Sequence, residues 1–118
     1  MSKPDHNLIK SISCAVKGIK YVYKHEKNFR KHTFVSIVVI LLAIYLNLNN
    51  TDLAIIILAI ALVLISEMIN SVIEYTWDKL EPDHHPVVGI IKDAMAGVVL
   101  FSSIASVLIG ILIFIKYF

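Results

Sequence analysis

Three long apolar blocks determine what this chain can fold into. They run from Thr33 to Leu46, from Leu53 to Ile65 and from Ala94 to Ile115, and none contains a proline. A helix that crosses a membrane needs about 20 mostly apolar residues. Because lipid offers no hydrogen-bond partners, the backbone of a spanning segment must satisfy its own polar groups as a helix. We therefore expect each block to form most of a membrane-spanning helix.

The composition agrees with an integral membrane protein. The chain has 118 residues, is 58% hydrophobic and has a mean hydropathy of +0.77. We expect one all-α membrane domain over residues 1–118, with a surface helix at 8–27 and membrane helices at 33–48, 51–80 and 92–116. The second membrane helix is about 45 Å long at 1.5 Å per residue, so it must extend beyond a hydrocarbon core of about 30 Å into the cytoplasm. Residues 47–52 form the turn before it, with Thr51 or Asp52 as the expected N-cap.

The N-terminal segment has the pattern of an amphipathic helix. Apolar residues recur at three-to-four spacing from Leu8 to Tyr23, and lysines occupy the opposite side. Such a helix is expected to lie in the membrane surface. It lacks the apolar core of a signal peptide, so we expect it to be retained. Glu26 is an isolated acid in this basic stretch and needs a separate explanation.

Basic residues predict the orientation in the membrane. Most lysines and arginines precede the first span, the 47–52 turn has none, and Lys79 and Lys92 lie in the next loop. By the positive-inside rule, the N-terminus and the 79–92 loop are cytoplasmic. Lys116 on the far side is the exception.

A polar stripe follows the second apolar block. At about 100° per residue, one helical face carries Glu67, Asn70, Ser71, Glu74 and Asp78. Ionisable groups at membrane depth are costly and usually functional. They fit three chemistries: a proton relay in a transporter, a metal site, or general-base chemistry on a lipid-borne group. Asp78 also fits a solvated helix end, and Asn70 a hydrogen bond between helices.

Further polar residues favour a phosphate site. We expect Lys92 and Asp93 to open the third membrane helix, where a helix N-terminus attracts anions. With Glu26, Glu74 and Asp93 as oxygen donors, this set suits a phosphate chain with a hard divalent cation such as Mg²⁺. No common nucleotide-binding glycine loop is present. The adjacent His84 and His85, beside Asp83, suit a solvated loop that contacts a ligand better than a zinc site.

The third apolar block carries small residues four apart, at Ser102, Ser106 and Gly110. Small residues on one helical face allow close helix contact in lipid. Three spans enclose little volume, so we expect an oligomer that builds its site between subunits.

Three segments, VKGIKYVYKHEKNFR (16–30), EMINSVIEYTWD (67–78) and GIIKDAMAGVVL (89–100), resemble the recurring blocks of the small prokaryotic diacylglycerol kinase family, in the same order. The resemblance implies a homotrimer that transfers the γ-phosphoryl group of ATP to a lipid hydroxyl at the cytoplasmic surface of the bacterial plasma membrane. It implies Mg²⁺ as cofactor, ATP as co-substrate and no nucleic-acid partner.

The resemblance also implies residue roles. Glu67 matches the general base, Asn70 the asparagine beside the reacting groups, and Glu26 and Glu74 the metal-holding glutamates. Lys92 and Asp93 match the pair that contacts the nucleotide, and Asp83, His84 and His85 match a loop segment near it.

Some positions differ from the diacylglycerol-type enzymes, which carry an arginine near Asn7, a tyrosine near Cys14, an acid near His32 and a serine near Ala96. NFRKH and KDAMAG look more like the undecaprenol kinase branch, so the expected acceptor is undecaprenol, with diacylglycerol as the alternative. A proton-coupled transporter would explain Glu67 but would leave Glu26, Glu74, Lys92 and Asp93 without a role. A purely structural protein would explain none of them.

Overall fold

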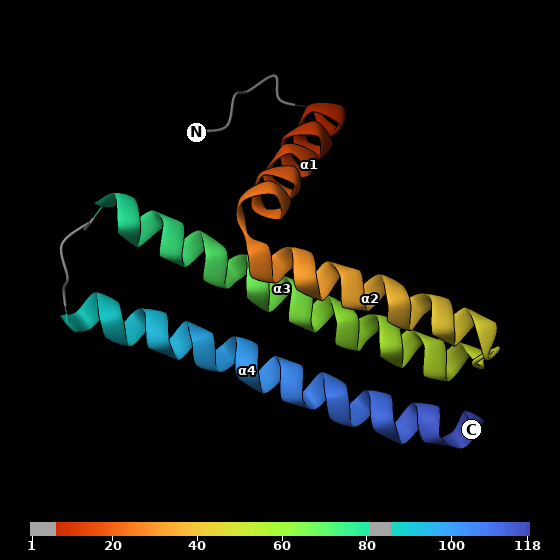
Figure 1. Ribbon diagram of the computed structural model, residues 1–118. Coiled ribbons are helices and arrows are strands. Elements are labelled where there is room, and N and C mark those ends of the chain that lie inside the picture. Colours follow the sequence, from red (N-terminus) through yellow and green to blue (C-terminus); the bar gives the residue numbers. More distant parts are fainter. Residues whose placement is uncertain (1–6, 81–85) are drawn as a thin grey trace.

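The computed structural model describes residues 7–80 and 86–118. The chain forms four α-helices and a terminal 3₁₀ turn: α1 (Leu8–His25), α2 (Lys27–Tyr45), α3 (Asn50–Leu80), α4 (Pro86–Phe114) and η1 (Ile115–Tyr117). Figure 1 shows α2, α3 and α4 side by side, with α1 leaving the bundle at a steep angle. Among the described residues, three helical segments are long and apolar enough to cross a membrane: Lys27–Tyr45, Asn50–Leu80 and Pro86–Tyr117. The expected helical membrane architecture, an N-terminal helix and three spans, is confirmed at this level.

Helix α1 is amphipathic and barely packed against the rest of the chain. The side chain of Asn7 caps its start, since Oδ1 accepts a hydrogen bond of 2.9 Å from the Lys10 amide. Val22, near its end, is its one buried residue, whereas apolar side chains such as Leu8, Ile12 and Ile19 are exposed. An unpartnered apolar face opposite a row of lysines is the surface expected of a helix that lies on a membrane.

The junction between α1 and α2 differs from the expected helix at 8–27. Helix α1 ends at His25, and Glu26 is extended, with φ −115° and ψ 108°. Helix α2 then begins at Lys27, before the expected start at Thr33. The mostly polar residues 27–32 are therefore part of this helix. Glu26 therefore lies at the corner between two helices rather than on a helical face.

The turn between α2 and α3 is fixed by backbone hydrogen bonds. Asn47 is left-handed (φ 56°), its amide bonds the Ile44 carbonyl, and the Leu48 amide bonds the Ala43 carbonyl, each at 3.1 Å. This is a Schellman motif, and buried Leu48 and Ala43 supply its apolar contact. The N-cap of α3 is Asn49, whose Oδ1 accepts a hydrogen bond from the Asp52 amide, so the expected cap at Thr51 or Asp52 is wrong.

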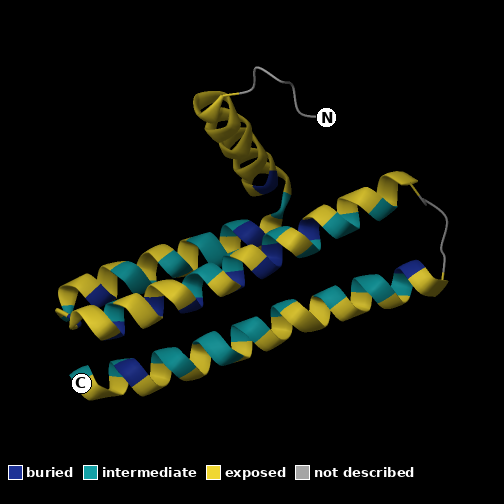
Figure 2. Ribbon diagram, turned by 180° about the vertical axis from the view of Figure 1, so that it is seen from behind, coloured by how far each residue is buried: buried dark blue, intermediate teal, exposed yellow. Residues whose placement is uncertain are grey.

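Helix α3 lies between α2 and α4 and carries most of the buried residues. The apolar cluster of Ala43, Leu48, Ile56 and Ile113 joins all three helices near the α2–α3 turn. In Figure 2 the buried residues follow the inner sides of the long helices, and their outer sides are exposed. Ser106 donates a hydrogen bond of 3.0 Å to the Ala59 carbonyl of α3. The small residues of α4 therefore do allow close contact, within one chain.

Helix α4 begins at Pro86, well before the expected start at Lys92. A proline fits the first turn of a helix because its missing amide would have no partner there. Gly89 is helical too, so the helix is continuous from Pro86 past the expected start. Lys92 and Asp93 consequently lie inside α4 rather than at its start.

Candidate active site

The polar stripe of α3 passes from a buried end to an exposed end. Glu67 and Ser71 are only 2% and 3% exposed, Glu74 is half-buried and Asp78 is exposed. Glu67 and Glu74 are two turns apart, about 10 Å along the axis. The stripe is therefore a ladder of carboxylates that leads from the interior of the bundle to the exposed end of α3.

Glu67 is surrounded by groups from three parts of the chain. Its Oε2 lies 3.4 Å from Nε2 of His32 in α2. The carboxylates of Glu26 and Glu74 are close enough for their negative charges to act on Glu67, as the charge of a protonated His32 does. The fold thus brings Glu26, Glu67 and Glu74 into one electrostatic cluster within a single chain.

Glu26 reaches this cluster because Arg30 holds the α1–α2 corner. Nη1 of Arg30 donates hydrogen bonds of 2.8 Å to the carbonyls of both Tyr23 and Lys24, the last turn of α1. These carbonyls have no partner within the helix, so Arg30 acts as a C-terminal cap. The ring of Tyr21 in α1 also meets that of Tyr75 in α3 edge-on, with 5.9 Å between the ring centroids, and the neighbouring Tyr75 hydroxyl is the main cause that raises the pKa of Tyr21.

Two buried polar atoms on the same face of α3 as Glu67 have no hydrogen-bond partner among the described residues: Oδ1 of Asn70 and Oγ of Ser71. Buried polar atoms without partners are rare in folded proteins, and each calls for a reason. Here both lie on the carboxylate stripe. Asn70 therefore presents an acceptor toward the same region as Glu67, and it does not bridge helices.

The donor set fits Mg²⁺ bound together with phosphate. Within residues 7–80 and 86–118, Glu26 and Glu74 form no ion pair, and no group of three or more His, Cys, Asp or Glu side chains could enclose a metal alone. Mg²⁺ commonly takes one or two carboxylates and completes its shell with substrate phosphates and water. Two unpaired glutamates beside a third carboxylate match that mode of binding.

Lys92 lies one turn farther along the ladder. Its Nζ contacts Oδ1 of Asp78, four residues after Glu74, at 2.5 Å. This ion pair joins α3 to α4 and brings a positive charge to the open end of the site. The expectation that Lys92 and Asp93 act at a helix N-terminus is wrong, because the helix starts at Pro86. Asp93 is exposed, and Asp83, His84 and His85 lie outside the described residues.

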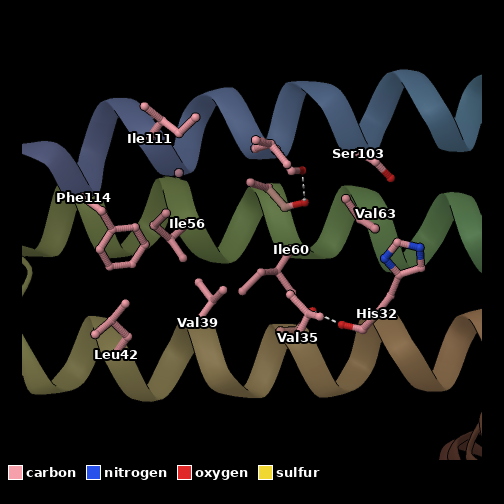
Figure 3. Close-up of a pocket in the computed structure, with 15 residues that line it drawn as sticks. His32, Val35, Val39, Leu42, Ile56, Ile60, Val63, Ser103, Ile111 and Phe114 are labelled. Atoms are coloured by element: carbon pink, nitrogen blue, oxygen red, sulfur yellow. Dashed lines mark hydrogen bonds between the residues drawn. The ribbon is translucent and has the colours of Figure 1, made fainter.

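An apolar groove ends one helical turn before Glu67. It has a volume of about 570 Å³ and is formed by residues of α2, α3 and α4. On α3 its wall follows Ile56, Ala59, Ile60 and Val63, and Glu67 is one turn beyond Val63. Figure 3 shows His32 at the same end of the groove as Val63 and Ser103.

Two residues of this site were missed from the sequence. His32 contacts Glu67 only because α2 packs on α3, and no periodicity within either helix signals that contact. Arg30 was read as one more charge of a basic segment. Arg30 is close enough in sequence to the end of α1 to cap that helix. The sequence does not show that α1 ends there, however, because no glycine or proline stands at Glu26.

The profile of the family described as prokaryotic diacylglycerol kinase matches residues 13–114. The chain belongs to the prokaryotic diacylglycerol kinase family. Within this family it is 36% identical over 105 residues to a diacylglycerol kinase of Synechocystis, covering 88% of this chain but only 60% of that relative. It is 33% identical over 119 residues to an undecaprenol kinase of Bacillus subtilis, covering 97% of both chains. With a diacylglycerol kinase of Escherichia coli it shares 27% identity over 101 residues, 86% of this chain and 83% of the relative.

Proposed function

We propose that this protein is a lipid kinase that transfers the γ-phosphoryl group of ATP to the hydroxyl of undecaprenol, with diacylglycerol as the alternative acceptor. The observation that carries the proposal is the position of Glu67. Its buried carboxylate lies between an apolar groove, which ends one turn away at Val63, and the carboxylates of Glu26 and Glu74, whose charges act on it. A lipid alcohol and a water-soluble triphosphate can meet only at such a boundary.

Glu67 would act as the general base. It accepts the proton of the lipid hydroxyl as the hydroxyl oxygen attacks the γ-phosphorus, and ADP leaves with the electrons of the broken P–O bond. General-base catalysis contributes about 10²–10⁴-fold to a rate. The unpartnered Oδ1 of Asn70 provides an acceptor beside this base that can orient the incoming hydroxyl. The groove below Glu67 is apolar enough to hold the first part of the acceptor's hydrocarbon chain.

Glu26 and Glu74 would hold Mg²⁺ together with the phosphates. When bound, the ion neutralises charge on the phosphoryl group that is transferred. Glu26 is presented by the corner that Arg30 caps, and Glu74 by the helix that carries Glu67, so the two carboxylates keep a fixed relation to the base.

Lys92 and Asp93 would contact the rest of the nucleotide. Lys92 is placed at the level of Asp78, one turn beyond Glu74, within reach of a triphosphate that extends along the ladder. Asp93 follows it on the exposed side of α4. The loop residues Asp83, His84 and His85 are proposed as further nucleotide contacts from the family resemblance alone.

We assign the cytoplasmic side of the bacterial plasma membrane to the N-terminus and to the 79–92 loop, because most basic residues lie there. We also propose a homotrimer with sites shared between subunits. The broad exposed apolar sides of α2, α3 and α4 support association in the membrane, since three helices cover little of one another.

Undecaprenol is preferred because the undecaprenol kinase of Bacillus subtilis matches along nearly the full length of both chains. The test uses purified protein in detergent with ATP labelled on the γ-phosphate and equal mole fractions of undecaprenol and diacylglycerol. We expect label in undecaprenyl phosphate at a clearly higher kcat/KM. Faster labelling of diacylglycerol would reverse the choice of acceptor, and labelling of neither lipid would refute the kinase.

A further inference from the structure

His32 is the one charged or titratable side chain that lines the apolar groove within the described part of the chain. Figure 3 shows its ring pointing from α2 toward α3, at the end of the groove where Val63 lies. The side chain is 32% exposed, while that of Glu67 is 3% exposed. His32 therefore separates the open groove from the buried carboxylate.

The contact between the two residues involves one oxygen of the carboxylate. Nε2 of His32 lies 3.4 Å from Oε2 of Glu67. The other charged groups that act on Glu67 are the carboxylates of Glu26 and Glu74, and both repel it. His32 is thus the neighbour that can hold a charged Glu67 in one orientation.

The backbone of His32 is well fixed. It lies in the second turn of α2, whose first turn is tied to α1 by Arg30. The hydroxyl of Ser36 donates a hydrogen bond of 2.7 Å to the His32 carbonyl. The ring therefore projects from a rigid element, as a residue that orients a catalytic group must.

We infer that His32 is a positioning residue for the transfer reaction: it holds Oε2 of Glu67, so that Oε1 faces the hydroxyl of a lipid whose chain occupies the groove. The inference rests on the proposed function. It adds a residue on α2 to a reaction whose other groups lie on α3, α4 and the corner at Glu26. A mispositioned base lowers the rate of the chemical step more than it weakens substrate binding, because the lost interaction matters mainly in the transition state.

Replacing His32 by glutamine or by asparagine distinguishes the position of its side-chain nitrogen from its polarity. The amide nitrogen of glutamine can occupy roughly the place of Nε2, whereas that of asparagine falls near Nδ1. We expect His32→Leu and His32→Asn each to lower kcat by about tenfold or more, with KM for ATP nearly unchanged. His32→Gln should recover to within about threefold of the wild type. Thr33→Val is the matched control, since Thr33 follows His32 on α2 but does not line the groove and its hydroxyl bonds the Phe29 carbonyl. This variant should keep wild-type kcat.

The outcomes separate this inference from the proposed function. An inactive wild type refutes the kinase itself. An active wild type with an equally active His32→Leu refutes the positioning role. Equal losses in His32→Gln and His32→Asn also refute it, because the position of the nitrogen would then be irrelevant. Melting temperatures of the glutamine and asparagine variants should agree, so that their difference in kcat reflects the site.

Discussion

The buried carboxylate of Glu67 does not help to stabilise the fold. Moving an isolated carboxylate out of water is expensive. The protein places two further glutamates near Glu67, and His32 is the one neighbour within the described residues that forms an ion-pair contact with it. A buried charge that is only partly paired lowers the stability of the fold. A position that carries such a charge is expected to serve chemistry.

Replacing Glu67 by Gln tests this directly. The variant keeps the volume and removes the base, so phosphoryl transfer should fall by about 10²–10⁴-fold. The melting temperature in detergent should stay the same or rise, and KM for ATP should change little. Both are measured on the same purified sample, by a labelled-ATP assay and by thermal unfolding. A variant that unfolds instead would indicate a structural role.

At the scale of the element, the corner between α1 and α2 determines where Glu26 points. One extended residue separates the two helices, and buried Val22 and Phe29 flank it on either side. Arg30 then satisfies two carbonyls at the end of α1. A single side chain thus links the surface helix to the membrane helix.

Replacing Arg30 by Met should loosen this corner. Hydrogen bonds from a charged group contribute roughly 1.5–3 kcal/mol, so we expect KM for Mg·ATP to rise by about tenfold. The change in kcat should be smaller, because Glu67 and His32 remain in place. Lys31→Met removes the same charge from an exposed neighbour and is the control. If the two variants have the same KM, Arg30 does not position Glu26.

The sequence predicts the helices better than their ends. Long apolar blocks specify three spans because lipid permits nothing else, and the 100° spacing correctly places Glu67, Ser71 and Glu74 on one face. The corner at Glu26 could not be predicted, because the residues around it are good helix formers. Helix α1 ends there because of contacts that Arg30 and Phe29 make in the folded chain. Helix α4 starts before the expected Lys92 because proline suits the first turn of a helix. The contact of His32 with Glu67 depends on how α2 packs on α3, which periodicity does not contain.

For the whole molecule, the end opposite the site is held by a polar cluster around the buried side chain of Asp52. Asp52 is 5% exposed, and its Oδ2 lies 2.9 Å from Nζ of Lys116 and accepts a hydrogen bond of 2.7 Å from the Tyr117 hydroxyl. The Asn49 amide donates to the same hydroxyl. The C-terminal turn is thereby fastened to the α2–α3 turn. The ion pair with Asp52 also neutralises Lys116, which is the basic residue that did not fit the positive-inside rule.

Asp52→Asn should lower the melting temperature by a few degrees, because Lys116 loses its carboxylate. Kinase activity well below that temperature should be unchanged, since Asp52 and Glu67 are four turns apart along α3. Combining Asp52→Asn with Lys116→Met should cost less than the sum of the two single changes. Unaltered melting of Asp52→Asn would show that the cluster contributes nothing to stability.

The central claim is that Glu26 and Glu74, from different parts of the chain, hold one metal ion beside Glu67. Binding of Mn²⁺ in place of Mg²⁺, followed by electron paramagnetic resonance with a non-hydrolysable ATP analogue, measures this without catalysis. We expect Glu26→Gln and Glu74→Gln each to weaken Mn²⁺ binding by about tenfold or more. The double variant should bind Mn²⁺ only slightly more weakly than either single variant. Glu67→Gln should bind Mn²⁺ with the wild-type affinity. Wild-type Mn²⁺ affinity in Glu26→Gln or in Glu74→Gln would contradict the central claim.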